Sequence, residues 1–223
     1  EVGRVDPVDL ADRYLEFLTG RAAASAGGLP VVLDCGHGAA FRLAPALFER
    51  LGARVTVLND RPDGLNINQG CGSTHPTVVA EAVRRRGAAV GFSFDGDADR
   101  CIAVDERGQV VDGDAILAIA ALDRQRRGAL PGAGVVATIM SNLGLERALR
   151  RAGITLHRSP VGDRHVLAEL RRLGLAVGGE QSGHVIFLDA GQTTGDGLLT
   201  AVELLNVMLR TGQPLSELAA VVE

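Results

Sequence analysis

Residues 91–105 read Gly91-Phe92-Ser93-Phe94-Asp95-Gly96-Asp97-Ala98-Asp99-Arg100-Cys101-Ile102-Ala103-Val104-Asp105, and this stretch decides the fold. Two apolar, strand-like runs flank a short loop in which three carboxylates alternate with small residues. Unpaired acids are too costly to bury, and carboxylates held this close together repel one another unless a cation joins them. Mg²⁺ prefers oxygen ligands and keeps positions open for water or a substrate phosphate, and the guanidinium of Arg100 suits phosphate recognition. The stretch therefore predicts a magnesium-binding turn between two strands, with Asp95, Asp97 and Asp99 as ligands.

Two other interpretations of the acidic loop need consideration. Asp-Gly is common in tight turns, so a polar hairpin without a metal stays open. The acids also match the first, third and fifth positions of an EF-hand loop, with Glu106 at the twelfth. That loop needs glycine at its sixth position, where this chain has Arg100, and helices rather than strands on either side. We therefore exclude the EF-hand.

Length and composition limit the class of protein. The chain has 223 residues, of which 46% are hydrophobic, so one large or two modest domains can be packed. No apolar run is long enough to span a bilayer, so no membrane partner is expected. Residues 1–7 lack a basic-then-apolar pattern, so no signal peptide is expected, and the missing initiator Met leads us to expect a piece of a longer protein.

Charge and cysteine usage narrow the class further. The net charge of −4 gives no electrostatic reason to expect nucleic acid. All basic residues are arginine, and their clusters come just before glycines, where they indicate helix ends rather than a nucleic-acid surface. Cys35, Cys71 and Cys101 are far apart and lack Cys-x-x-Cys spacing, which predicts reduced thiols, a cytoplasmic location and no zinc site.

The chain alternates strands and helices. A buried strand at residues 31–33 ends in a glycine-rich turn, a helix follows up to Leu51, and residues 54–58 form the next strand. A strand–helix–strand unit of this kind predicts a largely parallel sheet. After an irregular polar segment and a helix that starts near Pro76, the chain enters the strand that leads to the acidic loop.

The same plan restarts at residue 135. A strand at 135–139, a helix capped by Ser141-Asn142, a strand at 154–157 and a helix opened by Val161-Gly162-Asp163 lead to a second polar loop. Residues 85–91 and 172–178 are similar runs that precede the two polar loops. We therefore predict two similar three-layer α/β domains with mixed, largely parallel sheets, one at residues 1–110 and one at 111–223.

The second polar loop reads Gly179-Glu180-Gln181-Ser182-Gly183-His184. A carboxylate, a hydroxyl and an imidazole between glycines can make several hydrogen bonds to a polyhydroxylated ligand, with close approach of the backbone. A plain turn with a capped serine also fits this stretch. Further on, Thr193-Thr194-Gly195-Asp196-Gly197 opens a helix, and N-capping accounts for its Thr and Asp.

Together these loops resemble the α-D-phosphohexomutase superfamily. Asp95–Arg100 matches its metal loop, and Gly179–His184 matches its sugar-binding loop, in the same order. Other segments are similar to the bacterial branch that acts on glucosamine phosphates: residues 62–68, 71–76, 140–144 and 161–164, with Gln181 inside the sugar-binding loop.

The resemblance implies a function. Members of that branch interconvert glucosamine 6-phosphate and glucosamine 1-phosphate, on the route to UDP-N-acetylglucosamine and peptidoglycan, by Mg²⁺-dependent phosphoryl transfer through a phosphoserine and a bisphosphorylated sugar. The resemblance implies the following roles here: Asp95, Asp97 and Asp99 hold Mg²⁺, Arg100 supports the phosphoryl site, Glu180, Ser182 and His184 hold the sugar, and Asp163 and Arg164 lie near the cleft.

The chain also departs from the family pattern. Family enzymes have four domains, and this chain resembles the second and third; nothing in it matches the phosphoserine loop of the first domain or the phosphate-binding loop of the fourth. The chain alone is therefore expected to be inactive. His37 stands where the family commonly has Asn, which we attribute to packing or turn chemistry. The alternatives are a phosphomannomutase/phosphoglucomutase, or a non-catalytic module that binds sugar phosphates.

Overall fold

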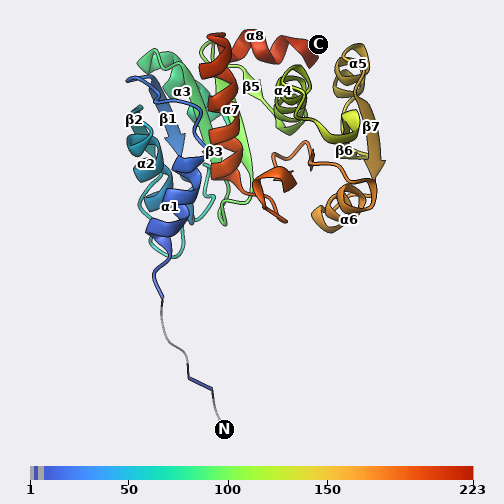
Figure 1. Ribbon diagram of the computed structural model, residues 1–223. Coiled ribbons are helices and arrows are strands. Elements are labelled where there is room, and N and C mark those ends of the chain that lie inside the picture. The colour runs from blue at the N-terminus through green and yellow to red at the C-terminus, as the bar shows by residue number, and fades with distance from the viewer. Residues whose placement is uncertain (1–2, 5–7, 223) are drawn as a thin grey trace.

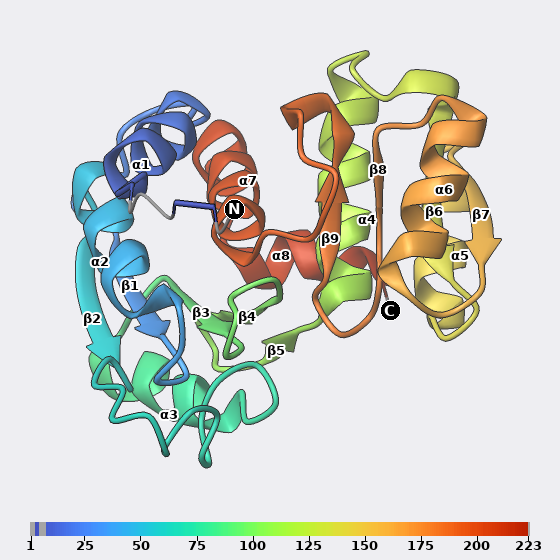
Figure 2. The same cartoon turned by 90° about the horizontal axis from the view of Figure 1, so that it is seen from below.

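The acidic loop connects two neighbouring strands of the first of two sheets. The computed structural model describes residues 3–4 and 8–222, so most of the N-terminal stretch considered for a signal peptide lies outside it. Figures 1 and 2 show two lobes side by side, each built on one sheet. The first sheet has the order β2-β1-β3-β4-β5, with β1 (Pro30–Asp34), β2 (Arg54–Leu58), β3 (Val90–Phe94), β4 (Cys101–Asp105) and β5 (Val110–Val111).

The second sheet repeats the first. Its order is β7-β6-β8-β9, with β6 (Gly134–Thr138), β7 (Thr155–Ser159), β8 (Val177–Gly179) and β9 (Val185–Phe187). In each sheet the first strand is parallel to the second and third, and the third is antiparallel to the fourth. Residues 95–100 and 180–184 connect equivalent strand pairs, β3–β4 and β8–β9. The predicted pair of mixed, largely parallel α/β units is confirmed.

Helices cover both faces of each sheet: α1 (Ala11–Gly20), α2 (Ala40–Arg50), α3 (Thr77–Arg86), α4 (Gly113–Arg126), α5 (Leu143–Arg151), α6 (Asp163–Leu173), α7 (Gly197–Thr211) and α8 (Leu215–Ala219). Short 3-10 turns complete the chain: η1 (Pro131–Ala133), η2 (Leu188–Ala190) and η3 (Ala220–Val222). Side chains of Asp112, Asn142 and Asp196 cap α4, α5 and α7, as N-capping propensity predicts. The arginine clusters that end α3 and α6 precede glycines in the left-handed conformation, which terminate these helices.

One continuous hydrophobic core joins the two lobes. It contains Leu33 and Phe92 from the first sheet, Val135 and Val177 from the second, and most of the apolar residues of α4 and α7, which are buried on all sides. Smaller cores lie under α3 on the outer face of the first sheet and under α6 on the outer face of the second. In Figure 1, α7 stands between the lobes, and it packs against α1, α4 and β4.

Some element boundaries differ from the sequence predictions. Strand β6 ends at Thr138, because Ile139 turns out of the sheet and is 63% exposed. Residues 215–222 form the short α8 followed by η3, and Val110–Val111 adds a strand to the first sheet that the sequence did not indicate. Such short edge pairs carry too few residues to show a period of their own.

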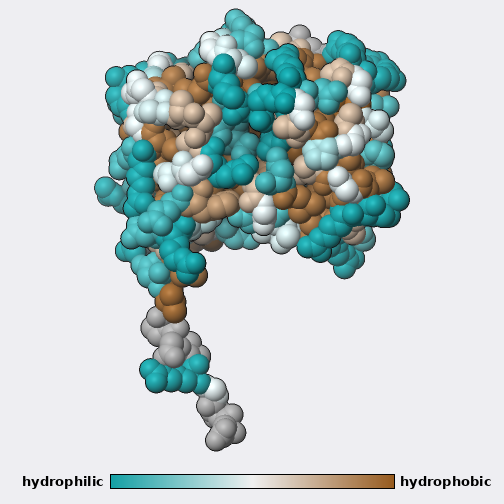
Figure 3. Space-filling view, in the orientation of Figure 1, coloured by the Kyte–Doolittle hydropathy of each residue, from teal (hydrophilic) through white to brown (hydrophobic). Residues whose placement is uncertain are grey.

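Figure 3 shows one face of the molecule, with polar residues along its middle and smaller apolar patches at its flanks. Scattered apolar patches of this kind are normal on a water-facing surface. Over residues 3–4 and 8–222, no helix combines the length and the apolar character needed to cross a bilayer.

Candidate functional site

The three predicted metal ligands converge in the turn between β3 and β4, which we call the metal loop (residues 95–100). Asp95, Asp97 and Asp99 each offer a carboxylate oxygen, and these atoms lie within 4.8 Å of one another. Ala98 has a φ of 61°, a left-handed conformation that costs a non-glycine residue roughly 1–3 kcal/mol. Backbone strain of this kind concentrates at functional sites, because the surrounding structure must hold it in place.

The metal loop gathers more negative charge than its partners neutralise. Burial, aided by the carboxylates of Asp99 and Asp97, raises the pKa of Asp95 to about 6, although a hydrogen bond from the Arg100 N–H opposes this. The Nε atom of Arg100 lies 3.6 Å from Asp95 Oδ2 and 3.7 Å from Asp99 Oδ1. One guanidinium approaches two of the three carboxylates, so the loop favours a further cation.

The donor set of the metal loop fits a hard divalent cation. All three ligands are oxygens, which Mg²⁺ and Mn²⁺ prefer. The Oδ1 atom of Asp99 is buried and accepts no hydrogen bond, although Arg100 Nε lies 3.7 Å away. A buried carboxylate oxygen without a hydrogen bond calls for an explanation such as an ion. The loop can therefore hold a cation through Asp95, Asp97 and Asp99.

The metal loop meets the predicted sugar-binding loop, residues 179–184, which we call the sugar loop. An isolated antiparallel bridge pairs Arg100 with His184, and the Cys101 N–H donates to Gly183 O at 3.1 Å. A Cβ atom on Gly183 would lie 2.3 Å from Cys101 O, so this approach requires glycine. Equivalent loops of the two repeated units thus form one site.

His184 lies against the metal loop. Its side chain is buried, and Nε2 accepts a hydrogen bond from the Gly195 N–H at 2.9 Å. The ring proton is therefore on Nδ1, which donates to Asp99 Oδ2 at 3.0 Å. Both ring nitrogens are engaged, so neither is free for a sugar in this arrangement, and His184 orients a candidate metal ligand instead.

The remaining predicted sugar-binding residues lie on the second lobe. Oε1 of Glu180 accepts the Gly162 N–H at 2.9 Å, which joins the sugar loop to the start of α6. Asp163 and Arg164 follow directly and are exposed, as is Ser182. The Arg164 N–H donates to Asp163 Oδ1 at 2.7 Å, and Arg164 Nε donates to His165 Nε2 at 3.4 Å. The second carboxylate oxygens of Glu180 and Asp163, the remaining guanidinium N–H groups and the Ser182 hydroxyl are thus available to a polar ligand.

A third loop, residues 193–197, packs against both others, and the sequence indicated only helix capping for it. The Gly197 N–H donates to Ala98 O at 2.9 Å, and Gly195 binds His184. We call this segment the clamp loop. A Cβ atom would lie 2.5 Å from the His184 ring at Gly195 and 2.5 Å from Arg100 O at Gly197. The sequence feature that could have indicated this loop is the pair of glycines on either side of Asp196.

Asp34, at the end of β1, organises the loops beneath the metal loop and was also missed. Its fully buried carboxylate accepts hydrogen bonds from the Gly36 N–H, the Asn59 side chain and the Gly72 N–H, at 2.9, 3.0 and 3.0 Å. His37 lies in this turn with a φ of 50°, and its Nδ1 accepts the backbone N–H of residue 61. The turn role expected for His37 agrees with these contacts.

A cavity of about 360 Å³ opens beside the metal loop. It is lined by α1, the start of α2, the metal loop and the clamp loop, and its wall includes Asp97, Asp99, Tyr14 and Asp196. A pocket with convergent polar groups next to clustered acids is the default binding-site candidate in this fold.

Fold and loops together define the class of this protein, and family comparison gives the same result. The model of "Phosphoglucomutase/phosphomannomutase, alpha/beta/alpha domain II" matches residues 12–108, and that of domain III matches residues 112–223. The chain belongs to the phosphoglucomutase/phosphomannomutase family and corresponds to its second and third domains.

Within that class, the chain is similar to curated phosphoglucosamine mutases. The enzyme of Moorella thermoacetica is 57% identical over 221 residues, which cover 99% of this chain and 50% of the relative. The enzyme of Symbiobacterium thermophilum is 59% identical over 211 residues, which cover 95% of this chain and 47% of the relative. The chain thus spans about half the length of the curated relatives it matches.

Solved structures agree on the fold. A phosphoglucomutase/phosphomannomutase family protein of Burkholderia thailandensis matches with a TM-score of 0.87 at 32% identity, over 97% of this chain and 47% of that one. The N-acetylphosphoglucosamine mutase of Aspergillus fumigatus, solved with GlcNAc-6P and magnesium, matches with a TM-score of 0.73 at 21% identity. The match covers 93% of this chain and 49% of that one. At that identity the second match supports the fold alone.

Proposed function

We propose that this chain is the metal- and sugar-binding half of a phosphoglucosamine mutase, an isomerase that interconverts glucosamine 6-phosphate and glucosamine 1-phosphate. The observation that carries the proposal is the junction of the acidic metal loop and the sugar loop through the pairing of Arg100 with His184. Similarity to curated phosphoglucosamine mutases over nearly the whole chain supports the choice of substrate.

Each group in the site has a proposed role. Mg²⁺ held by Asp95, Asp97 and Asp99 would neutralise charge on the transferred phosphoryl group. Arg100, which borders the same carboxylates, would bind phosphoryl oxygens. Glu180 and Ser182 would hold the sugar through its hydroxyls or amino group, and Asp163 and Arg164 would lie at the edge of the cleft. His184, whose two ring nitrogens are engaged, would orient Asp99 beside them.

The rest of the reaction depends on parts outside this chain. Phosphoryl transfer in this class needs a nucleophile held in line with the phosphoryl group. We place the phosphoserine and a second phosphate-binding loop in first and fourth domains, with residues 1–110 and 111–223 as the second and third. The reaction would pass through a bisphosphorylated sugar and serve the route to UDP-N-acetylglucosamine and peptidoglycan in the cytoplasm.

A chimera tests this proposal. The matched half of the Moorella thermoacetica enzyme is replaced by this chain, and turnover is measured on glucosamine 6-phosphate, glucose 6-phosphate and mannose 6-phosphate. We expect kcat/KM to be at least about tenfold higher on the amino sugar, and Asp97→Asn to lower it at least about a hundredfold. The purified chain alone should be inactive.

Three outcomes would contradict parts of the proposal. Faster turnover of the neutral sugars would favour a phosphomannomutase/phosphoglucomutase. A folded chimera that binds sugar phosphate without turning it over would favour a non-catalytic module. Turnover by the chain alone would show that the nucleophile lies within it.

A further inference from the structure

Tyr14 connects the first helix to the region behind the metal loop. It is the only tyrosine of the chain, and it lines the cavity whose wall includes Asp97 and Asp99. Its hydroxyl donates to Asp196 Oδ1 at 2.7 Å. The same oxygen accepts the Leu199 N–H at 2.9 Å and so caps α7. One carboxylate therefore fastens α1 to the start of α7.

The neighbours of Asp196 hold the metal loop at two points. On one side, Gly197 donates its N–H to Ala98 O, the carbonyl of the residue in the left-handed conformation. On the other side, Gly195 donates to His184, which in turn donates to Asp99. Asp196 therefore lies at the centre of a segment that fixes one strained carbonyl and one candidate metal ligand.

The clamp loop is packed too tightly against its neighbours to move independently of them. A Cβ atom on Gly195 would lie 2.5 Å from the His184 ring, and one on Gly197 2.9 Å from Ala98 O. Close-packed contacts transmit small shifts rather than damping them. Burial and the adjacent Asp196 raise the pKa of Tyr14, so its hydroxyl remains a hydrogen-bond donor at neutral pH.

We infer that Tyr14 and Asp196 are positioning residues for the metal loop. They fix the clamp loop, and through it the Ala98 carbonyl and the Asp99 carboxylate, without touching the cation. The inference rests on the proposed function in one respect, because it requires the metal loop to bind a divalent cation. A purely structural role, in which Tyr14 only attaches α1, would lower stability and leave cation affinity unchanged.

Mn²⁺ affinity, measured by EPR on the full chain, separates these roles. Tyr14→Phe removes one hydroxyl and should weaken Mn²⁺ binding about threefold to fivefold, the effect of one hydrogen bond. Asp196→Ala removes the tyrosine contact and the cap together, and should weaken it about tenfold or more. Circular dichroism establishes that each variant is folded. Tyr14→Phe keeps the test valid if Asp196→Ala does not fold.

Asn142→Ala is the matched control. Asn142 caps α5 with a 2.9 Å hydrogen bond from the Leu145 N–H, the same distance as in the Asp196 cap, but it has no contact with the metal loop among the described residues. This variant should lose stability comparable to that lost by Asp196→Ala and keep its Mn²⁺ affinity within about twofold.

Tyr14 fluorescence gives a second readout, because the chain has no tryptophan. Paramagnetic Mn²⁺ in the metal loop should quench Tyr14 emission with the same midpoint as the EPR titration, and Asp97→Asn should move that midpoint to at least about tenfold higher Mn²⁺ concentration. Wild-type binding with unchanged affinity in both test variants would overturn the inference and leave the metal site intact. No Mn²⁺ binding by the wild-type chain would remove the metal site, and the inference would fall with it.

Discussion

At the scale of single residues, Asp95 links protonation to cation binding. Its pKa rises from 3.8 to about 6 in the folded chain, chiefly through burial and then through its acidic neighbours. The folded state therefore holds more protons than the unfolded state between about pH 4 and pH 6, so this group makes the cation-free chain less stable as the pH rises through that window. A divalent cation held by the proposed site would replace the proton and relieve the repulsion.

Cation stabilisation should accordingly depend on pH. We predict that Mg²⁺ raises the melting temperature more at about pH 7.5 than at about pH 5, because protons compete for Asp95 at the lower pH. Thermal unfolding followed by circular dichroism measures both increments. Asp95→Asn has no titrating carboxyl group at this position, so the increases in melting temperature at the two pH values should be small and similar. Equal increments in the wild-type chain would contradict the role given to Asp95.

The clamp loop makes a second prediction about single residues. Gly195→Ala places a methyl group 2.5 Å from the His184 ring, so we expect a loss of about 1–3 kcal/mol in the free energy of unfolding, as for overpacking. Gly20→Ala, at the end of α1 with no atom within 4 Å of the added methyl, is the control and should change stability by less than about 1 kcal/mol. Urea unfolding measures both, and a Gly195 variant as stable as the control would contradict the tight packing described.

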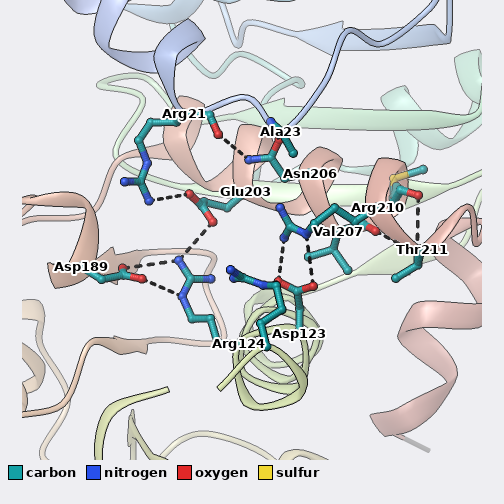
Figure 4. A network of polar contacts seen from close by, with 12 residues as sticks. Arg21, Ala23, Asp123, Arg124, Asp189, Glu203, Asn206, Val207, Arg210 and Thr211 are labelled. Carbon is teal, nitrogen blue, oxygen red and sulfur yellow. Dashed lines mark hydrogen bonds and ion pairs between the residues drawn. The ribbon is translucent and has the colours of Figure 1, made fainter. Parts of the chain in front are cut away.

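At the scale of elements, α7 carries polar residues that tie the lobes together. Figure 4 shows Glu203 between two guanidiniums, those of Arg21 from the first lobe and Arg124 from α4. Arg124 is 1% exposed, and it also pairs with Asp189 at 2.9 Å and lies over the Phe187 ring. Buried charges are tolerated only when paired in this way.

Removing one member of this network should be costly. Glu203→Ala leaves Arg124 buried with one carboxylate fewer, and we expect a loss of about 3 kcal/mol in the free energy of unfolding. The control is Glu169→Ala, which breaks an exposed ion pair with Arg172 within α6 and should cost much less. Both are measured by urea unfolding. Equal losses would show that the buried network does not hold the lobes together.

The elements also show what the sequence could predict. Strands such as β2 and helices such as α5 follow from apolar periodicity and capping, because these signals are local. The metal and sugar loops were found because their acids, hydroxyls and glycines are concentrated in short runs. The clamp loop and Asp34 were missed because their contacts join residues far apart in sequence: Tyr14 reaches Asp196 across 182 positions. Helix capping was a sufficient local explanation for Asp196, so nothing in the sequence indicated its contact with Tyr14.

At the scale of the whole molecule, the two lobes share one core. Apolar residues of both sheets pack around α4 and α7, and the same helices carry the ion network. Two sheets joined in this way differ from two domains on a flexible linker, whose interfaces are smaller and more polar. The metal loop and sugar loop therefore lie on one packed unit, where the Arg100–His184 bridge joins them.

A shared core predicts cooperative unfolding of both lobes. Tyr14 fluorescence reports on α1 and its contact with the start of α7, whereas far-UV circular dichroism reports on all helices. We expect the two urea transitions to coincide within error, the signature of two-state behaviour. Two separate transitions, with Tyr14 changing before or after the ellipticity, would contradict the shared core.

The most direct test of the metal site is a Mn²⁺ titration of this chain and of its Asp97→Asn variant, followed by EPR. Asp97 is exposed, so its substitution should leave the fold intact. We predict binding near one equivalent for the wild-type chain, and at least about tenfold weaker binding, or about 1.4 kcal/mol, for Asp97→Asn. A chain that binds no Mn²⁺, or a variant that binds it equally well, would contradict the claim that the acidic loop is a preformed cation site.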